Sequence, residues 1–110
     1  MQKELFDELL INTDDEVPHK IKLTYYMITD CVREEYCDLK VYGAEIEKEE
    51  IFEDGKSKYE SKIIKNLFFR HSEAENFMKK LKDGGVTPMG LMSAVSEHIN
   101  DQIYRLTYEG

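Results

Sequence analysis

The chain has 110 residues, of which 41% are hydrophobic, and it carries 23 acidic against 15 basic side chains. This length predicts a single domain over residues 1–110, with enough apolar residues for a packed core. The formal net charge of −8 argues against a duplex-binding protein that relies on phosphate neutralisation. No motif in the sequence fixes a reaction.

The first segment, residues 3–11, has the spacing of a short amphipathic helix. Leu5, Phe6, Leu9 and Leu10 would share one helical face, with acidic side chains on the other. A helix of about two turns is too short to be stable in water on its own. We therefore expect it to pack on the rest of the chain.

We predict an antiparallel meander of three strands, at residues 20–32, 36–52 and 56–70. In the first strand apolar residues alternate, and β-branched and aromatic side chains are frequent. In the second strand the phase of the alternation changes at Gly43. Such a change predicts a β-bulge at that glycine.

The dipeptide Asp54-Gly55 predicts a tight hairpin between the second and third strands. A two-residue loop of type I′ requires positive φ at both central residues, which favours this pair. A loop of that length would place Ile46 opposite Ile63 in the ladder. A slip of one residue would move every side chain of the strand to the other face.

Two helices are predicted to close the chain, at residues 72–83 and 88–106. Ser72 and Glu75 have the spacing of a capping box, and a threonine–proline pair opens the second helix. The predicted fold is therefore α+β. It is a three-stranded antiparallel β-meander with a short N-terminal helix and two C-terminal helices packed on the sheet.

This order of elements, with YGAEI at residues 42–46 and Val86-Thr87-Pro88 opening the last helix, resembles a known family. The family is a domain of unknown function, found in short, uncharacterised cytoplasmic proteins of spore-forming Gram-positive bacteria. The resemblance covers residues 23–101. It implies a bacterial, cytoplasmic protein and carries over no catalytic residues.

No set of residues indicates a catalytic, cofactor or metal site. Cys31 and Cys37 are six positions apart, and no second Cys or His pair completes a zinc tetrad. We predict that both cysteines are reduced and structural. No histidine shares with a Ser, Cys or carboxylate a short motif that would suggest a nucleophile and its base. We therefore expect no cofactor and no metal.

The compartment is predicted from what the sequence lacks. No uninterrupted apolar run has the length of a signal peptide or a membrane span. Two cysteines are too few for a secreted disulfide framework. These features favour a cytoplasmic protein without membrane contact.

Charge is unevenly distributed along the predicted hairpin. Residues 34–54 are rich in acidic side chains, and residues 55–70 are rich in basic ones. Pairing of the two strands would set these charges against each other. The alternative is an acidic surface that attracts a basic partner. Aromatic residues in the strands allow a nucleic-acid surface, but the net charge and the missing ribonucleoprotein motif argue against it.

One feature predicts a contact surface. Two predicted strands carry apolar residues on both faces, although a sheet with helices on one side is usually polar on the other. A second subunit or a partner would cover the surplus. The predicted interaction surface comprises Tyr26, Ile28, Ile64, Phe68, Leu5, Phe6 and Leu9.

We therefore expect a small non-enzymatic regulatory or adaptor protein that acts through protein–protein contacts and self-associates, as a dimer. One alternative is an acidic inhibitor or nucleic-acid mimic that blocks a basic site on a partner. A second alternative is an enzyme whose site is assembled across subunits from residues such as His71, Tyr59 or Glu45.

Overall fold

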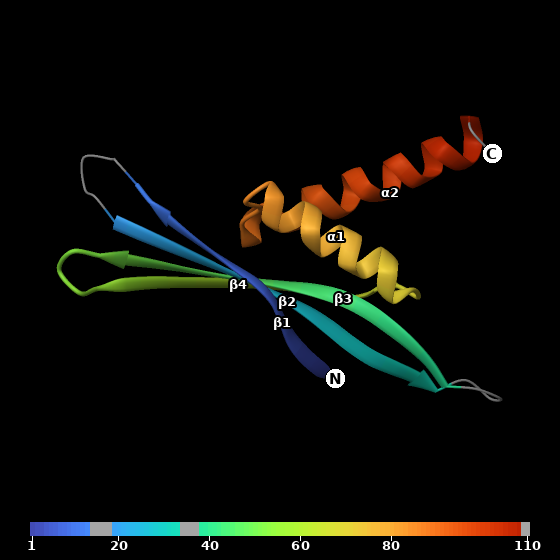
Figure 1. Ribbon diagram of the computed structural model, residues 1–110, viewed down its shortest axis with the longest axis horizontal. Helices are drawn as coiled ribbons and strands as arrows, with labels where there is room; N and C mark the ends of the chain where they lie inside the picture. The colour runs from blue at the N-terminus through green and yellow to red at the C-terminus, as the bar shows by residue number, and fades with distance from the viewer. Residues whose placement is uncertain (14–18, 34–37, 109–110) are drawn as a thin grey trace.

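A computed structural model describes the backbone of residues 1–13, 19–33 and 38–108, and the side chains of these residues as far as Asp101. Four strands form one antiparallel sheet in the order β1-β2-β3-β4. They are β1 (Gln2–Asn12), β2 (His19–Arg33), β3 (Asp38–Phe52) and β4 (Ser57–Phe68). The helices α1 (His71–Asp83) and α2 (Leu91–Tyr108), linked by the 3-10 turn η1 (Pro88–Gly90), both lie on one side of this sheet (Figure 1).

The N-terminal segment is a strand, so the predicted helix at residues 3–11 and the predicted three-stranded sheet are wrong. β1 pairs with β2, and the register shifts at Phe6. This bulge lets Phe6 and Leu9 both pack against the core, while Leu5 and Leu10 are 56% and 60% exposed. A bulge changes the phase of a strand's alternation. Here it produces a spacing of apolar residues that resembles that of a helix.

The hairpin between β3 and β4 forms at Asp54-Gly55 as predicted, but its loop has three residues, 53–55, rather than two. The Phe52 amide donates a hydrogen bond to the Lys56 carbonyl oxygen at 2.9 Å. Gly55 has φ +84°, as expected for the left-handed residue of a three-residue hairpin loop. The Asp54 carboxylate accepts a hydrogen bond from the Lys56 amide at 2.9 Å.

The longer loop changes the register of β4 by one residue. Ile46 lies opposite Lys62, and the predicted pairing with Ile63 is wrong. Ile64 and Phe68 consequently share the core side of the sheet with Ile46. The loop length therefore decides which apolar residues of β4 are covered by the helices.

Gly43 marks an irregularity of the ladder, as predicted, but the extra residues lie in β4. Between the pairs made by Tyr42 and Ala44, β4 contributes two more residues than β3. One of them, Asn66, has φ +59°. A Cβ atom on Gly43 would lie 2.2 Å from the carbonyl oxygen of Ile64. The glycine therefore permits a close approach of two backbones.

The helices begin differently from the prediction. The N-cap of α1 is Arg70, and no side chain caps this helix, so the predicted capping box of Ser72 and Glu75 does not form. Glu75 instead lies 3.3 Å from the His71 ring nitrogen Nδ1. Thr87 is the N-cap of a proline-initiated turn, as predicted, but that turn is the 3-10 element η1 rather than the start of α2.

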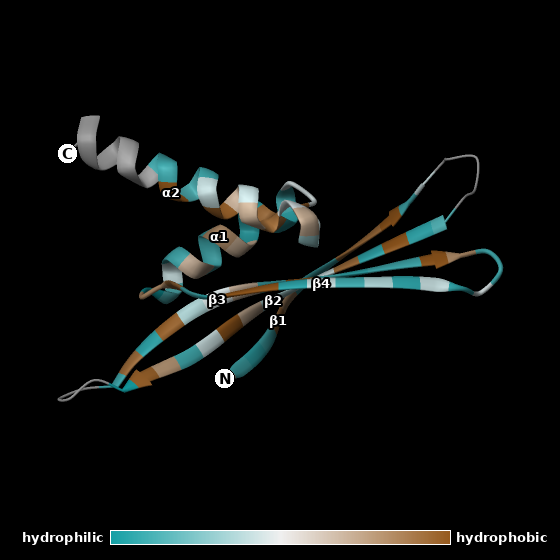
Figure 2. Ribbon diagram, turned by 180° about the vertical axis from the view of Figure 1, so that it is seen from behind, coloured by the Kyte–Doolittle hydropathy of each residue, from teal (hydrophilic) through white to brown (hydrophobic). Residues whose placement is uncertain are grey.

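The core lies between the helices and one sheet face, and the hydropathy of the strands alternates accordingly (Figure 2). Its largest fully buried side chain, Tyr25, donates a hydrogen bond to the Val86 carbonyl oxygen at 2.9 Å. Burial raises the pKa of Tyr25 to about 12. The predicted alternation in β2 is confirmed. The core residues are Leu23, Tyr25, Met27, Tyr42, Ala44, Ile46, Phe68, Ala74, Phe77, Met78, Leu81, Leu91 and Val95.

Candidate interaction surface on the open sheet face

The sheet face that points away from α1 and α2, here called the open face, is covered by neither helix (Figures 1 and 2). An uncovered face of an antiparallel sheet is usually polar. This face nevertheless presents exposed apolar side chains from every strand, of which Tyr59 is the most exposed at 61%. By the strand register, this apolar set comprises Leu5, Leu10, Val32, Leu39, Ile51, Tyr59 and Ile63.

One lysine, Lys3, connects the polar side chains in the middle of the open face. The Nζ atom of Lys3 forms ion pairs with the carboxylates of Glu45 and Glu47, the latter at 2.8 Å. It also lies 4.1 Å from the ring centroid of Tyr26, within range of a cation–π contact. Lys3 belongs to β1 and the two glutamates belong to β3, so its side chain crosses β2. We call these residues, together with Tyr59, the Lys3 cluster.

Electrostatics keep the Lys3 cluster in its charged, paired form. Hydrogen bonds to Glu45 and Glu47 raise the pKa of Lys3. Burial raises the pKa of Glu47, but hydrogen bonds from Lys3 and Tyr59 outweigh burial and leave this pKa below its ordinary value. A carboxylate with a lowered pKa and a lysine with a raised pKa are poorly suited to proton transfer near neutral pH. The cluster therefore fixes the positions of the side chains in the middle of the open face.

At the Lys3 cluster the open face offers little room for a small ligand. Its hollow beside the Lys3 cluster has a volume of about 120 Å³ and is lined by residues such as Lys22, Glu49 and Tyr59. Pockets for drug-sized ligands are typically about 300 to 1,000 Å³. The geometry suits contact with a macromolecular surface better than enclosure of a substrate.

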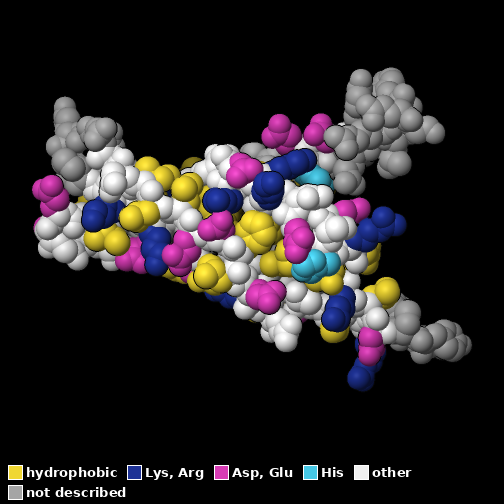
Figure 3. Space-filling view, viewed as in Figure 1, with side chains coloured by type: hydrophobic (Ala, Val, Ile, Leu, Met, Phe, Trp, Pro, Cys, Tyr) yellow, Lys and Arg dark blue, Asp and Glu magenta, His cyan; other side chains and the backbone are white. Residues whose placement is uncertain are grey.

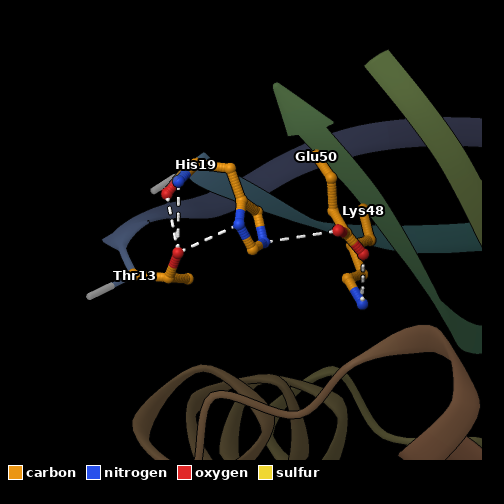
Figure 4. Close-up of polar contacts among 4 residues, drawn as sticks. All are labelled: Thr13, His19, Lys48 and Glu50. Carbon is orange, nitrogen blue, oxygen red and sulfur yellow. Dashed lines mark hydrogen bonds and ion pairs between the residues drawn. The ribbon is translucent and has the colours of Figure 1, made fainter. Parts of the chain in front are cut away.

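A second group of polar contacts lies on the helix-facing side, at the end of the sheet that extends beyond the helices (Figure 4). The His19 ring lies 3.0 Å from the Thr13 hydroxyl and 3.4 Å from the Glu50 carboxylate. Lys48 pairs with Glu50 at 3.0 Å, and its hydrogen bond lowers the pKa of Glu50. The Thr13 hydroxyl also donates to the His19 carbonyl and accepts from the His19 amide. These contacts tie the ends of β1 and β2 together.

The third candidate lies between α1 and α2, where a hollow of about 390 Å³ includes Lys80, His98 and Asp101 in its lining. The His98 ring packs edge-on against Phe68 and Phe77, each with centroids 5.3 Å apart. This histidine is therefore part of an aromatic cluster.

The structure divides the predicted interaction surface between the two sides of the sheet. Leu5, Tyr26 and Ile28 belong to the open face, although Ile28 is only 1% exposed. The other four predicted residues contribute to the core or pack against it: Phe6, Leu9, Ile64 and Phe68.

The residues suggested for an enzyme do not meet within one chain. His71 starts α1, where it pairs with Glu75 and contacts the Tyr42 ring edge-on. Glu45 and Tyr59 lie on the open face, on the opposite side of the sheet from the helices. Neither is placed beside His71.

Sequence reasoning missed Lys3, Glu47, Leu10 and Ile63 as members of the open face. Lys3 was hidden because its segment has a helical spacing. In a strand, Lys3 and Leu5 share a face, which was the only available signal for its position. Its contact with Glu47 joins residues 44 positions apart and depends on the order of the strands.

The cysteine prediction is tested only at one position. Cys31 is free, in agreement with the predicted reduced state, but it is exposed, so its predicted structural role is wrong. Cys37 lies outside the described residues. Among the described residues, no group of three or more His, Cys, Asp or Glu side chains could hold a metal ion. No described helix combines the length and the apolar character needed to cross a membrane.

Comparison with known protein families places the chain. The model of a family of unknown function, DUF6514, matches residues 7–101. Neither a curated protein nor a solved structure matches the chain.

Proposed function

We propose that this chain, which belongs to the DUF6514 family of unknown function, is a small non-enzymatic regulatory or adaptor protein that acts through protein–protein contacts. The observation that carries the proposal is the open face, where apolar side chains surround the Lys3 cluster. Exposed apolar surface with a polar framework is typical of sites that bind other proteins.

The composition of the open face supports this role. Tyr26 and Tyr59 supply aromatic area of the kind that dominates binding energy in protein interfaces. Lys3 pairs with two carboxylates in place and balances one of their two charges, which lowers the cost of removing them from water when a partner docks. Figure 3 shows hydrophobic side chains set between charged ones along the part of the sheet that extends beyond the helices.

The acidic-inhibitor alternative rests on a different observation. Glu45, Glu47 and Glu49 alternate along β3 on the open face, and they would present a row of negative charge to a basic partner. Lys3 pairs with the first two of them, so the protein-contact proposal has the stronger support. The two functions differ in salt dependence, because binding to a basic site weakens steeply as salt rises.

We also propose a cytoplasmic location and an origin in spore-forming Gram-positive bacteria. The location is supported by the low cysteine content and by the lack of a membrane-spanning helix among the described residues. The origin is supported by the resemblance of the sequence.

Photo-crosslinking tests the proposed contact surface. A photoreactive residue at Tyr59, on the open face, should form one discrete adduct with a protein in cells. The same residue at Lys79, which is exposed on α1, serves as the control and should not form that adduct. Equal adducts at both positions, or none at Tyr59, would contradict the proposal. If crosslinking in a lysate forms this adduct at low salt but not at high salt, the acidic inhibitor is favoured.

A further inference from the structure

The two edge strands of the sheet differ in how well they could accept another strand. β1 is interrupted by the bulge at Phe6, and its neighbour Asp7 is paired with Lys82 of α1 at 3.0 Å. β4 is regular from Ser57 until the positive φ of Asn66. Bulges protect an edge, whereas a regular extended edge leaves backbone donors and acceptors available for pairing.

We propose that a second copy of this chain pairs antiparallel with the β4 edge along residues 57–65, about a two-fold axis at Ser61. This inference rests on the proposed function and gives its self-association a partner, an interface and a register. Ser61 is the midpoint of the regular stretch, so this pairing uses all of it. Backbone hydrogen bonds along an added strand supply affinity.

The side chains of β4 complement one another in this register. Glu60 lies opposite Lys62 of the partner subunit, and the two-fold axis generates this pair twice. On the open face, Tyr59 lies opposite Ile63 of the partner subunit, an aromatic–β-branched pair that stabilises antiparallel strands. Tyr59 and Ile63 are 61% and 37% exposed in the single chain, so both have surface to bury.

Neighbouring registers are disfavoured by charge. A two-fold axis perpendicular to the sheet leaves the open faces of both copies on the same side. The axis can therefore pass only through a residue of β4, and the neighbouring registers have their axis at the residue before or after Ser61. An axis at Glu60 sets Glu60 against itself and Lys58 against Lys62. An axis at Lys62 sets that lysine against itself. Like charges directly opposite each other destabilise a strand pair.

The surroundings of the edge fit a two-fold contact. A groove beside β4 is lined by Glu60, Ser61, Lys62, Pro88 and Met89, and Met89 is 85% exposed. Because the axis passes through Ser61, pairing brings the grooves of both copies together. It also joins the two open faces on one side of a continuous sheet of twice the width. A partner would then meet two Lys3 clusters at once.

Charge reversal tests the register. Sedimentation velocity of the wild-type chain over a concentration series should show a monomer–dimer equilibrium. Glu60→Lys alone and Lys62→Glu alone should each weaken the dimer by about tenfold or more, because each creates two like-charge pairs. An equimolar mixture of the two variants should form a heterodimer, because position 60 of each chain then lies opposite a side chain of the other sign at position 62 of its partner.

The mixture also controls for folding, because a variant that fails to fold would not form the heterodimer. Thermal melts of each variant at low concentration provide a second check. A wild-type dimer that is unaffected by either reversal would overturn the proposed edge, and so would a chain that is monomeric throughout the series. Tyr59 also contacts the partner subunit in this dimer, so only an adduct at Tyr59 with a different protein reports the proposed function, and neither result removes that adduct. Loss of the open-face adduct with intact charge-dependent dimers would instead contradict the proposed function alone.

Discussion

Replacement of Gly43 by alanine is the sharpest test of the fold, because it probes the crossing of β3 and β4. The added Cβ would lie 2.2 Å from the Ile64 carbonyl oxygen and 2.8 Å from the Lys65 Cα atom. Both are backbone atoms of a paired strand, so no side-chain rotation can relieve the contact. β4 would have to move away, or lose ladder hydrogen bonds.

The expected cost follows from two opposing effects. Overpacking of this kind costs about 1 to 3 kcal/mol, and rigid backbone contacts belong at the upper end. Alanine also restricts the unfolded chain relative to glycine, which offsets about 0.4 to 1 kcal/mol. We therefore expect Gly43→Ala to lower the free energy of unfolding by about 2 kcal/mol. For a chain of this size the melting temperature should fall by about 10 °C.

Urea denaturation followed by circular dichroism measures this change, at a protein concentration where the chain is monomeric. Gly90→Ala is the matched control, because the nearest atom to its new Cβ is a side-chain carbon of Val86 at 3.4 Å. It should lie within about 0.5 kcal/mol of wild type. A Gly43→Ala variant as stable as wild type, or one no less stable than Gly90→Ala, would refute the close backbone approach.

Three further predictions concern single side chains and pH. Tyr25→Phe leaves the Val86 carbonyl without its buried donor and should lower the free energy of unfolding in urea by about 1 to 2 kcal/mol. An unchanged urea midpoint would show that water replaces the hydroxyl. Gly55→Val should lower the free energy of unfolding by about 1 to 2 kcal/mol, because φ is +84° at this position, although no atom lies within 4 Å of the new Cβ. The strain is in the backbone, so Gly55→Ala should show a large part of the same loss. A neutral result would contradict the loop conformation. The pKa of Glu47 is lowered from 4.5 in the folded chain, so its contribution to stability is complete above that value and is lost as the pH falls through the lower, folded pKa. Glu47→Gln should therefore flatten the acid side of the stability–pH curve, and an identical slope would show that Lys3 does not hold this carboxylate.

The parts of the fold that could be predicted are those controlled by local sequence. In β2, the alternation of Leu23, Tyr25 and Met27 identifies the core face directly, because every second residue of a strand shares a side. Asp54-Gly55 marks the hairpin because few residue pairs tolerate positive φ. The two C-terminal helices follow from apolar periodicity and their terminating residues. None of these features requires knowledge of distant parts of the chain.

The failures also have local causes. The segment from Lys3 to Ile11 has helical spacing because a bulge divides its apolar residues between two faces. The same Asp-Gly pair can close a two-residue or a three-residue loop, and the difference of one residue inverts the facing of β4. Ser72 and Glu75 have the correct spacing for a capping box, but the N-cap of α1 is Arg70, two residues before Ser72, so the motif is out of position.

The candidate surface depended on these errors more than the core did. The core residues of β2 are apolar under any pairing, whereas the Lys3 cluster exists only if β1 is the strand beside β2. If residues 3–11 formed the predicted helix, nothing in the sequence would place Lys3 beside Glu45 and Glu47. The acidic side chains of β3 would then have no basic partner from this segment. With β1 in the sheet, Lys3 pairs with two of these carboxylates and joins β1 to β3 across β2. A protein-contact surface is therefore favoured over an acidic decoy because of one strand, and removal of the Lys3 charge should expose the acidity that it now partly balances. The measurement is the salt dependence of any partner captured at Tyr59, which should become steeper in Lys3→Ala than in the exposed control Lys79→Ala.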